Sequence, residues 1–266
     1  MTPLCLSNRQ GGTPFDWSVA RVLAERCALA YTETPRSLVD KNIPGQFITN
    51  SNTDTEALVI QEPQAITVAF RGSQNLKDWL QDFKVAKQHP RSDLIVEEVG
   101  DVVQVHTGFM QDVDSITEAL LPAIRSLLQP CPVFVTGHSK GAAEATLFAL
   151  ELQRQKFNVA GVYLFGCPRV GDSIFRNVYN STLYEETFRV VNENDIVPRV
   201  PGVLMGYRHV GQEIFLPVGG GFSLNPSLWV KMLSDAIGLW GAWRHEQDVL
   251  VSDHNIAAYQ RRISLL

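Results

Sequence analysis

The sequence has 266 residues, of which 45% are hydrophobic and 19% are charged, an ordinary composition for a globular protein. Its formal net charge is −5, from 23 basic and 28 acidic residues, so we expect no nucleic-acid partner, which usually needs a clustered basic surface. No stretch approaches the roughly 18–20 apolar residues of a membrane-spanning helix. A single α/β domain of this length is common, and we predict one domain over residues 1–266.

The N-terminus and the cysteines bear on the cellular compartment. The first ten residues contain no basic segment followed by a long apolar run, so they do not indicate a secretory signal. The cysteines are too far apart to form a metal clip or a dense disulfide framework; they are Cys5, Cys27, Cys131 and Cys167. We therefore expect a reducing, cytoplasmic location, and leave open secretion by a route that needs no signal peptide.

The spacing of apolar residues predicts the secondary structure. In chain order we expect a helix at 17–31, strands at 57–61 and 66–70, a short helix at 75–85, strands at 94–99 and 102–105, a helix at 107–128, a strand at 133–136, a helix at 142–157, and strands at 162–165, 187–191 and 207–210. Strands that alternate with helices favour a mainly parallel sheet covered by helices on both faces.

One five-residue run carries the first chemical signal. Gly137-His138-Ser139-Lys140-Gly141 has the pattern G-x-S-x-G, and it lies between an expected strand and an expected helix. In that context the pattern is typical of a nucleophilic serine held on a sharp turn. Side chains in place of Gly137 and Gly141 would collide with neighbouring backbone. We expect a strained Ser139 that projects its hydroxyl into solvent, with the N–H of Lys140 placed to bind an oxyanion.

A serine nucleophile needs a histidine base held by a carboxylate, and in this kind of fold the acid and then the base follow the serine in the chain. Asp195 lies in the loop after the strand at 187–191, which is where α/β sheets place their working residues. Three histidines follow Ser139. Chain order favours His254, and leaves His209 and His245 open.

Several motifs resemble the class 3 lipase family, the group that includes the fungal triacylglycerol lipases, and they follow one another in family order. They are Phe70-Arg71-Gly72-Ser73, Val105-His106-Thr107-Gly108-Phe109, Gly137 to Gly141, Phe165 to Gly171, Asn194 to Pro198, and Asp253-His254. Any one motif is weak, whereas the ordered set is highly specific. The resemblance covers roughly residues 20–262.

The resemblance implies an α/β-hydrolase fold in which Ser139, Asp195 and His254 form a catalytic triad. It also implies that the backbone N–H groups of Ser73 and Lys140 form the oxyanion hole. No metal or organic cofactor is expected. In this family the helix after the F-R-G-[ST] motif can act as a lid, so residues 75–85 are either a lid or a permanently packed helix. Its apolar side chains are the expected substrate contacts; they are Leu76, Trp79 and Leu80.

One residue and one segment depart from the family pattern. Lys140 stands where an apolar residue is usual, and its charged side chain needs water or a carboxylate. Glu144, four residues further along the helix, is the candidate partner, and a surface ion pair is the simplest arrangement. Residues 217–247 begin with a glycine-rich stretch and continue with a markedly apolar helix-like segment. This segment is either core or a second lid-like cap that contacts lipid.

The sequence therefore predicts an ester hydrolase that works through an acyl-enzyme on lipid acyl esters. Triacylglycerol is the first choice of substrate, and phospholipids with A1 regiochemistry or short-chain esters are the alternatives. An acyltransferase and a catalytically inactive lipid- or partner-binding module are the rivals. The sequence does not indicate an oligomeric state.

Overall fold

The computed structural model describes Leu4 and residues 15–73, 91–95, 102–127, 131–217, 219–227 and 253–266. Within them an eight-stranded sheet has the order β1-β2-β3-β6-β7-β8-β9-β10. Its strands are β1 (Gly45–Asn50), β2 (Thr55–Gln61), β3 (Ile66–Phe70), β6 (Val133–His138), β7 (Val159–Phe165), β8 (Thr187–Asn192), β9 (Gln212–Leu216) and β10 (Ser223–Leu224).

The middle of this sheet is parallel and its edges are antiparallel. Strands β3, β6, β7, β8 and β9 pair in parallel, whereas β1, β2 and β10 join the edges in antiparallel pairs. All residues of β3, β6 and β8 are buried, as expected for strands covered on both faces. The α/β-hydrolase expectation is confirmed. A separate hairpin pairs β4 (Arg91–Ile95) with β5 (Val102–His106).

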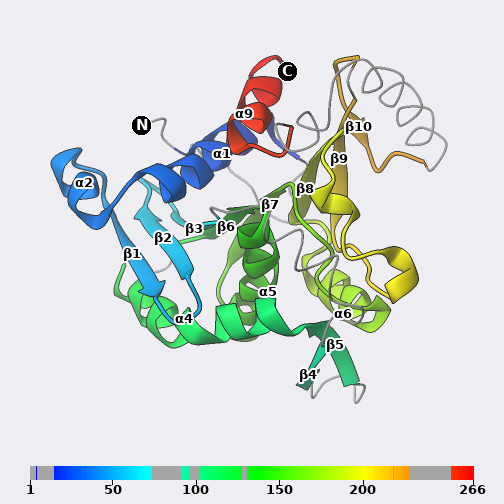
Figure 1. The fold of residues 1–266 in the computed structure, drawn as a ribbon. Helices are drawn as coiled ribbons and strands as arrows, with labels where there is room; N and C mark the ends of the chain where they lie inside the picture. Colours follow the sequence, from blue (N-terminus) through cyan, green and yellow to red (C-terminus); the bar gives the residue numbers. More distant parts are fainter. Residues whose placement is uncertain are drawn as a thin grey trace.

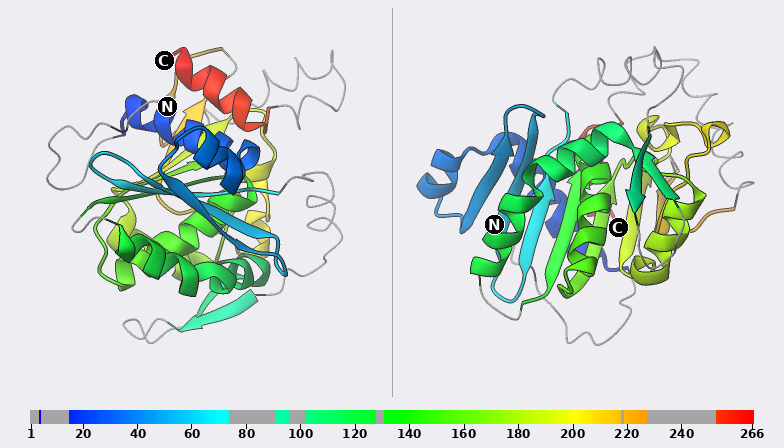
Figure 2. Two further views of the ribbon diagram at one scale, coloured as in Figure 1. Left: turned by 90° about the vertical axis from the view of Figure 1, so that its left-hand side faces the viewer. Right: turned by 90° about the horizontal axis from the view of Figure 1, so that it is seen from below.

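Helices cover both faces of the sheet (Figures 1 and 2). One face carries α1 (Trp17–Thr32) and α9 (Ile256–Ser264), which pack against each other. The opposite face carries α4 (Thr107–Ser126), α5 (Lys140–Arg154) and α6 (Ser173–Leu183), and α2 (Pro35–Asp40) lies beside β1. Each layer has its own apolar core. No helix within the described residues is both long enough and apolar enough to cross a bilayer.

Most of the expected elements are present, and the exceptions have local causes. The strand expected at 207–210 is wrong: Arg208 forms only an isolated bridge with Gly171, and the strand is β9. Strand β1 and helix α6 were not predicted. The sequence did contain a signal for the start of α6, since aspartate is a preferred N-cap residue. In the structure the Asp172 side chain accepts the backbone N–H of Phe175 and caps the helix.

Some predictions lie outside the described residues. They include the helix at 75–85 with Leu76, Trp79 and Leu80, and the apolar segment after residue 227. The lid, the cap and the substrate contacts on these segments stay predictions. Two short 3₁₀ helices, η1 (Val197–Arg199) and η2 (Val203–Met205), shape the chain between β8 and β9.

Candidate active site

Ser139 lies on a tight turn between β6 and α5 and has φ 61° and ψ −129°. A positive φ is uncommon for a residue other than glycine and stores strain. A Cβ at Gly137 would lie 2.2 Å from the carbonyl oxygen of Gly141, and a Cβ at Gly141 would lie 2.4 Å from that of Phe70. Both glycines are therefore required by backbone contacts, as predicted.

The Ser139 side chain faces a cleft and not open solvent, which corrects the expectation. The residue is only 2% exposed, and it lines a cleft of about 600 Å³ together with Tyr31, Ser73, His138 and His254. Its Oγ has no hydrogen-bond partner within the described part of the chain. A buried hydroxyl without a partner is unusual in native structures, and in a cleft it is available to a ligand.

Asp195 and His254 meet behind this cleft. Asp195 follows β8, His254 precedes α9, and the Nδ1 of His254 lies 2.7 Å from the Oδ2 of Asp195. Both side chains are almost fully buried. If Nδ1 carries the proton, it donates to the carboxylate and leaves the lone pair of Nε2 free. That Nε2 has no partner among the described residues, so Ser139 and His254 each present one unsatisfied atom.

The carboxylate of Asp195 accepts two further hydrogen bonds. The hydroxyl of Tyr259 donates to Oδ2 at 2.5 Å, and the backbone N–H of Val197 donates to Oδ1 at 2.8 Å. Burial, followed by the charge of Asp195, raises the pKa of Tyr259 well above its usual value, so the phenol stays protonated and remains a donor. Three donors fix the carboxylate, and Tyr259 was not identified from the sequence.

Two loops are tied together around the Asp195–His254 pair. Asn192 donates to the backbone carbonyl of Asp253 at 2.9 Å, and Asn194 donates to its carboxylate at 3.0 Å. The loop after β8 and the loop before α9 are 59 residues apart in sequence. These bonds therefore hold the loop of Asp195 and the loop of His254 in a fixed position relative to each other.

Gly166, at the end of β7, leaves room for the same pair. It has φ +59°, and a Cβ there would lie 2.8 Å from the Oδ2 of Asp195 and 2.9 Å from the Nδ1 of His254. Only glycine combines this backbone conformation with this close approach. Gly166, the glycine of the F-G-x-P-R-V-G motif at Phe165 to Gly171, is therefore needed for the close packing of Asp195 and His254.

Of the other two downstream histidines, the structure describes only His209, and that residue does not line the cleft of Ser139. His209 places its Nε2 2.7 Å from the carbonyl oxygen of Pro198, so that nitrogen is committed to a structural hydrogen bond. His245 lies outside the described residues. Among the described histidines that follow Ser139, only His254 lines the cleft.

His138, the residue before Ser139, links three parts of the site and was not predicted. Its Nε2 lies 2.5 Å from the backbone carbonyl of His254, and its Nδ1 lies 2.9 Å from the hydroxyl of Tyr31. The carbonyl can only accept, so Nε2 carries the proton and Nδ1 accepts from Tyr31. Burial and then the nearby His254 lower the pKa of His138 well below its usual value. A neutral imidazole therefore bridges α1, the nucleophile turn and the histidine loop.

The two expected oxyanion donors lie beside Ser139. Ser73 lines the same cleft, three residues beyond the end of β3. Lys140 is the first residue of α5, so its backbone N–H has no acceptor inside the helix. The positive end of the helix dipole also points at this turn. The arrangement suits the binding of a negatively charged oxygen.

The side chain of Lys140 is not part of a surface ion pair. Its Nζ lies 3.1 Å from Glu144, the predicted partner, and 3.2 Å from Asp112 of α4, which was not predicted. The lysine side chain is 12% exposed and that of Glu144 is fully buried. The partner was therefore correct and the surface location was wrong.

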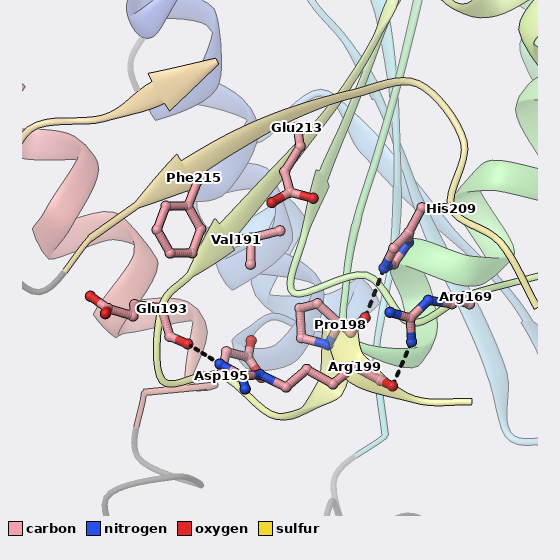
Figure 3. A pocket seen from close by; sticks show the side chains of 9 residues that line it. All are labelled: Arg169, Val191, Glu193, Asp195, Pro198, Arg199, His209, Glu213 and Phe215. Atoms are coloured by element: carbon pink, nitrogen blue, oxygen red, sulfur yellow. Dashed lines mark hydrogen bonds between the residues drawn. The ribbon is translucent and has the colours of Figure 1, made fainter. Parts of the chain in front are cut away.

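A polar crevice of about 160 Å³ lies beside Asp195 (Figure 3). Two arginines of the crevice brace the loop after β8. Arg169 donates to the backbone carbonyls of Arg199 and Pro201, and Arg199 donates to that of Glu193. The arginine of the F-G-x-P-R-V-G motif thus holds the loop that carries Asp195.

Comparisons with known proteins agree with this geometry. Residues 67–205, about half of the chain, match the sequence profile of the family described as Lipase (class 3). This chain belongs to the class 3 lipase family. A secreted mono- and diacylglycerol lipase from Fusarium solani is 34% identical to it over 157 residues, which are 58% of this chain and 44% of that protein. A chloroplastic phospholipase A(1) from Arabidopsis thaliana is 30% identical over 159 residues, 54% of this chain and 35% of that protein.

A solved structure supports the fold of this chain. A lipase from Rhizopus microsporus var. chinensis superposes with a TM-score of 0.63 at 29% identity, covering 75% of this chain and 74% of that one. The chain spans less than half the length of the two curated relatives described above. The expectation of a cytoplasmic protein is wrong, because one of these relatives is named as secreted and the other as chloroplastic.

Proposed function

We propose that this class 3 lipase hydrolyses acyl esters of lipids through a covalent intermediate on Ser139. One observation carries the proposal: His254, which is paired with the buried carboxylate of Asp195, lines the same cleft as the strained Ser139, whose hydroxyl has no hydrogen-bond partner among the described residues. Acylglycerols are the first choice of substrate, which the name of the Fusarium solani relative supports.

The proposed reaction uses the two atoms without a partner among the described residues, the Oγ of Ser139 and the Nε2 of His254. His254 takes the proton of Ser139 through Nε2 while the serine Oγ attacks the ester carbonyl. The carbonyl oxygen becomes negative and is bound by the N–H groups of Ser73 and Lys140. Protonated His254 then donates to the leaving alcohol, and Asp195 stabilises the imidazolium. Water repeats these steps on the acyl-enzyme and releases the fatty acid.

A fluorophosphonate probe tests the nucleophile. We expect the wild-type protein to be labelled and Ser139→Ala to remain unlabelled. Absence of labelling in the wild type would support an inactive lipid-binding module and refute the proposal. Asp195→Asn should lower kcat far more than the control Asp172→Asn, whose carboxylate caps α6. Equal effects would show that Asp195 is not the triad acid.

Phospholipase A1 activity is the second candidate, and the name of the Arabidopsis thaliana relative favours it. A panel of p-nitrophenyl esters, emulsified triacylglycerol and phosphatidylcholine, with Ser139→Ala as the blank, ranks the substrates. Release of fatty acid from the phospholipid but not from triacylglycerol would favour the second candidate. The same panel with added alcohol separates hydrolysis from acyl transfer.

A further inference from the structure

Three ionisable side chains lie together behind the nucleophile turn. The Nζ of Lys140 is 3.2 Å from the Oδ2 of Asp112 and 3.1 Å from the Oε1 of Glu144. Their side chains are 12%, 13% and 0% exposed, respectively. We call Asp112, Lys140 and Glu144 the lysine cluster. Lys140 and Glu144 belong to the first turns of α5, whereas Asp112 belongs to α4, which packs alongside α5 (Figure 1).

The cluster is built so that the lysine keeps its charge. Burial by itself lowers the pKa of Lys140, but the attraction of Glu144 and Asp112 outweighs it and the pKa is raised. Burial raises the pKa of Glu144 to about 8, against the attraction of Lys140. Burial also raises the pKa of Asp112, while a hydrogen bond between Asp112 and Glu144 lowers the pKa of Asp112 and raises that of Glu144. Of the two acids, Asp112 is therefore the one favoured to carry the negative charge that faces Lys140. Buried charges survive only when they are paired in this way.

Lys140 connects the lysine cluster to the proposed oxyanion hole. Its backbone N–H is the first of α5 and lies directly after Ser139, while its side chain does not line the catalytic cleft. The pair with Glu144 is internal to α5 and cannot fix the helix against its surroundings. The pair with Asp112 connects the first turn of α5 to a second element. Asp112 therefore restrains the residue whose N–H meets the oxyanion.

We propose that Asp112 is a positioning residue for the oxyanion hole, which holds the Lys140 side chain and thereby fixes the backbone N–H of Lys140 relative to Ser139 and Ser73. The inference rests on the proposed hydrolase function. The competing explanation is a buried ion pair that affects only folding stability, so the test separates turnover from stability.

Asp112→Asn is the decisive variant because Asp112 touches no reacting group. Active sites are counted with a phosphonate, and kcat and KM are measured for a p-nitrophenyl ester. Complete loss of one oxyanion donor lowers kcat about 100- to 1,000-fold, so a donor that is kept but misplaced should lower kcat per active site about tenfold. KM should stay at the wild-type value, because the donor acts on charge that develops in the transition state.

A matched control removes another buried ion pair, which lies at the end of the sheet where the parallel strands begin. Arg26 and Glu62 form a buried pair at 2.8 Å, near the start of β3 and away from Ser139. Glu62→Gln should lower the melting temperature and leave kcat per active site unchanged. If Asp112→Asn behaves like this control, the positioning role is refuted. A wild type that does not react with the phosphonate would instead refute the proposed function.

A second comparison remains decisive if Asp112→Asn yields little folded protein. Lys140→Arg keeps the cation and should retain most of the wild-type kcat. Lys140→Met removes the cation from the same position and should lower kcat per active site about tenfold, as for a misplaced donor. Equal kcat values in the two variants would overturn the proposal, because the side-chain charge would then have no influence on turnover.

Discussion

Gly141→Ala tests whether the close approach of β3 and α5 builds the site. The added Cβ would lie 2.4 Å from the carbonyl oxygen of Phe70 and 2.8 Å from two backbone carbon atoms. Real Cβ contacts are essentially never below 3.0 Å, so the strand and the helix must separate by about 0.6 Å or more. None of these three contacts involves a flexible side chain that could rotate away.

The separation should reduce both activity and stability. The end of β3 leads to Ser73, and the start of α5 carries Ser139 and the N–H of Lys140. Misplacing a reacting group by about 1 Å can lower a rate about 100-fold, so we expect kcat to fall about 10- to 100-fold. Overpacking of this kind typically lowers the free energy of unfolding by about 1–3 kcal/mol.

The assay measures ester hydrolysis per phosphonate-titrated active site, together with the melting temperature. Gly219→Ala is the matched control, because a Cβ there would have no atom of the described residues within 4 Å; it should change neither quantity. Wild-type kcat in Gly141→Ala would refute the reasoning, since the backbone would then have absorbed the methyl group without moving the oxyanion donors.

Three further substitutions probe the site. Tyr259→Phe removes a donor to Asp195, and a hydrogen bond to a charged group is worth about 1.5–3 kcal/mol. We therefore expect kcat to fall about tenfold. An unchanged kcat would show that the Tyr259 hydroxyl does not support the function of Asp195. Gly166→Ala should displace the Asp195–His254 pair and therefore lower kcat by a larger factor than it changes KM. Steady-state kinetics test this, and an unchanged kcat would contradict it. Glu144 has a pKa of about 8 in the folded protein against an ordinary 4.5, so the folded state binds the extra proton and stability falls as pH rises from about 4.5 to about 8. Glu144→Gln should flatten this fall in melting temperature, and an identical slope would contradict the assignment.

The sequence predicted the frame of the molecule because that information is local. Short apolar runs predicted the strands around Ser139, helical spacing of apolar residues predicted the helices, and the close contacts of Gly137 and Gly141 followed from the turn. Strand β1 escaped prediction because it is half-exposed and its periodicity is weak, whereas helix α6 was missed although its buried Phe175, Tyr179 and Leu183 follow one another at helical spacing. The cytoplasmic expectation rested on absent signals, and the names of relatives contradict it.

Contacts between distant elements could not be read from the sequence. Asp112 meets Lys140 because α4 packs beside α5, and Tyr31 meets His138 because α1 crosses the end of β6. Tyr259 reaches Asp195 from the last helix. Local patterns contain neither the order of strands in the sheet nor the rotation of helices above it. The sequence by itself determined which residues could form the nucleophile, acid and base; only the tertiary structure decided which neighbours hold them, because those neighbours are set by packing across the sheet.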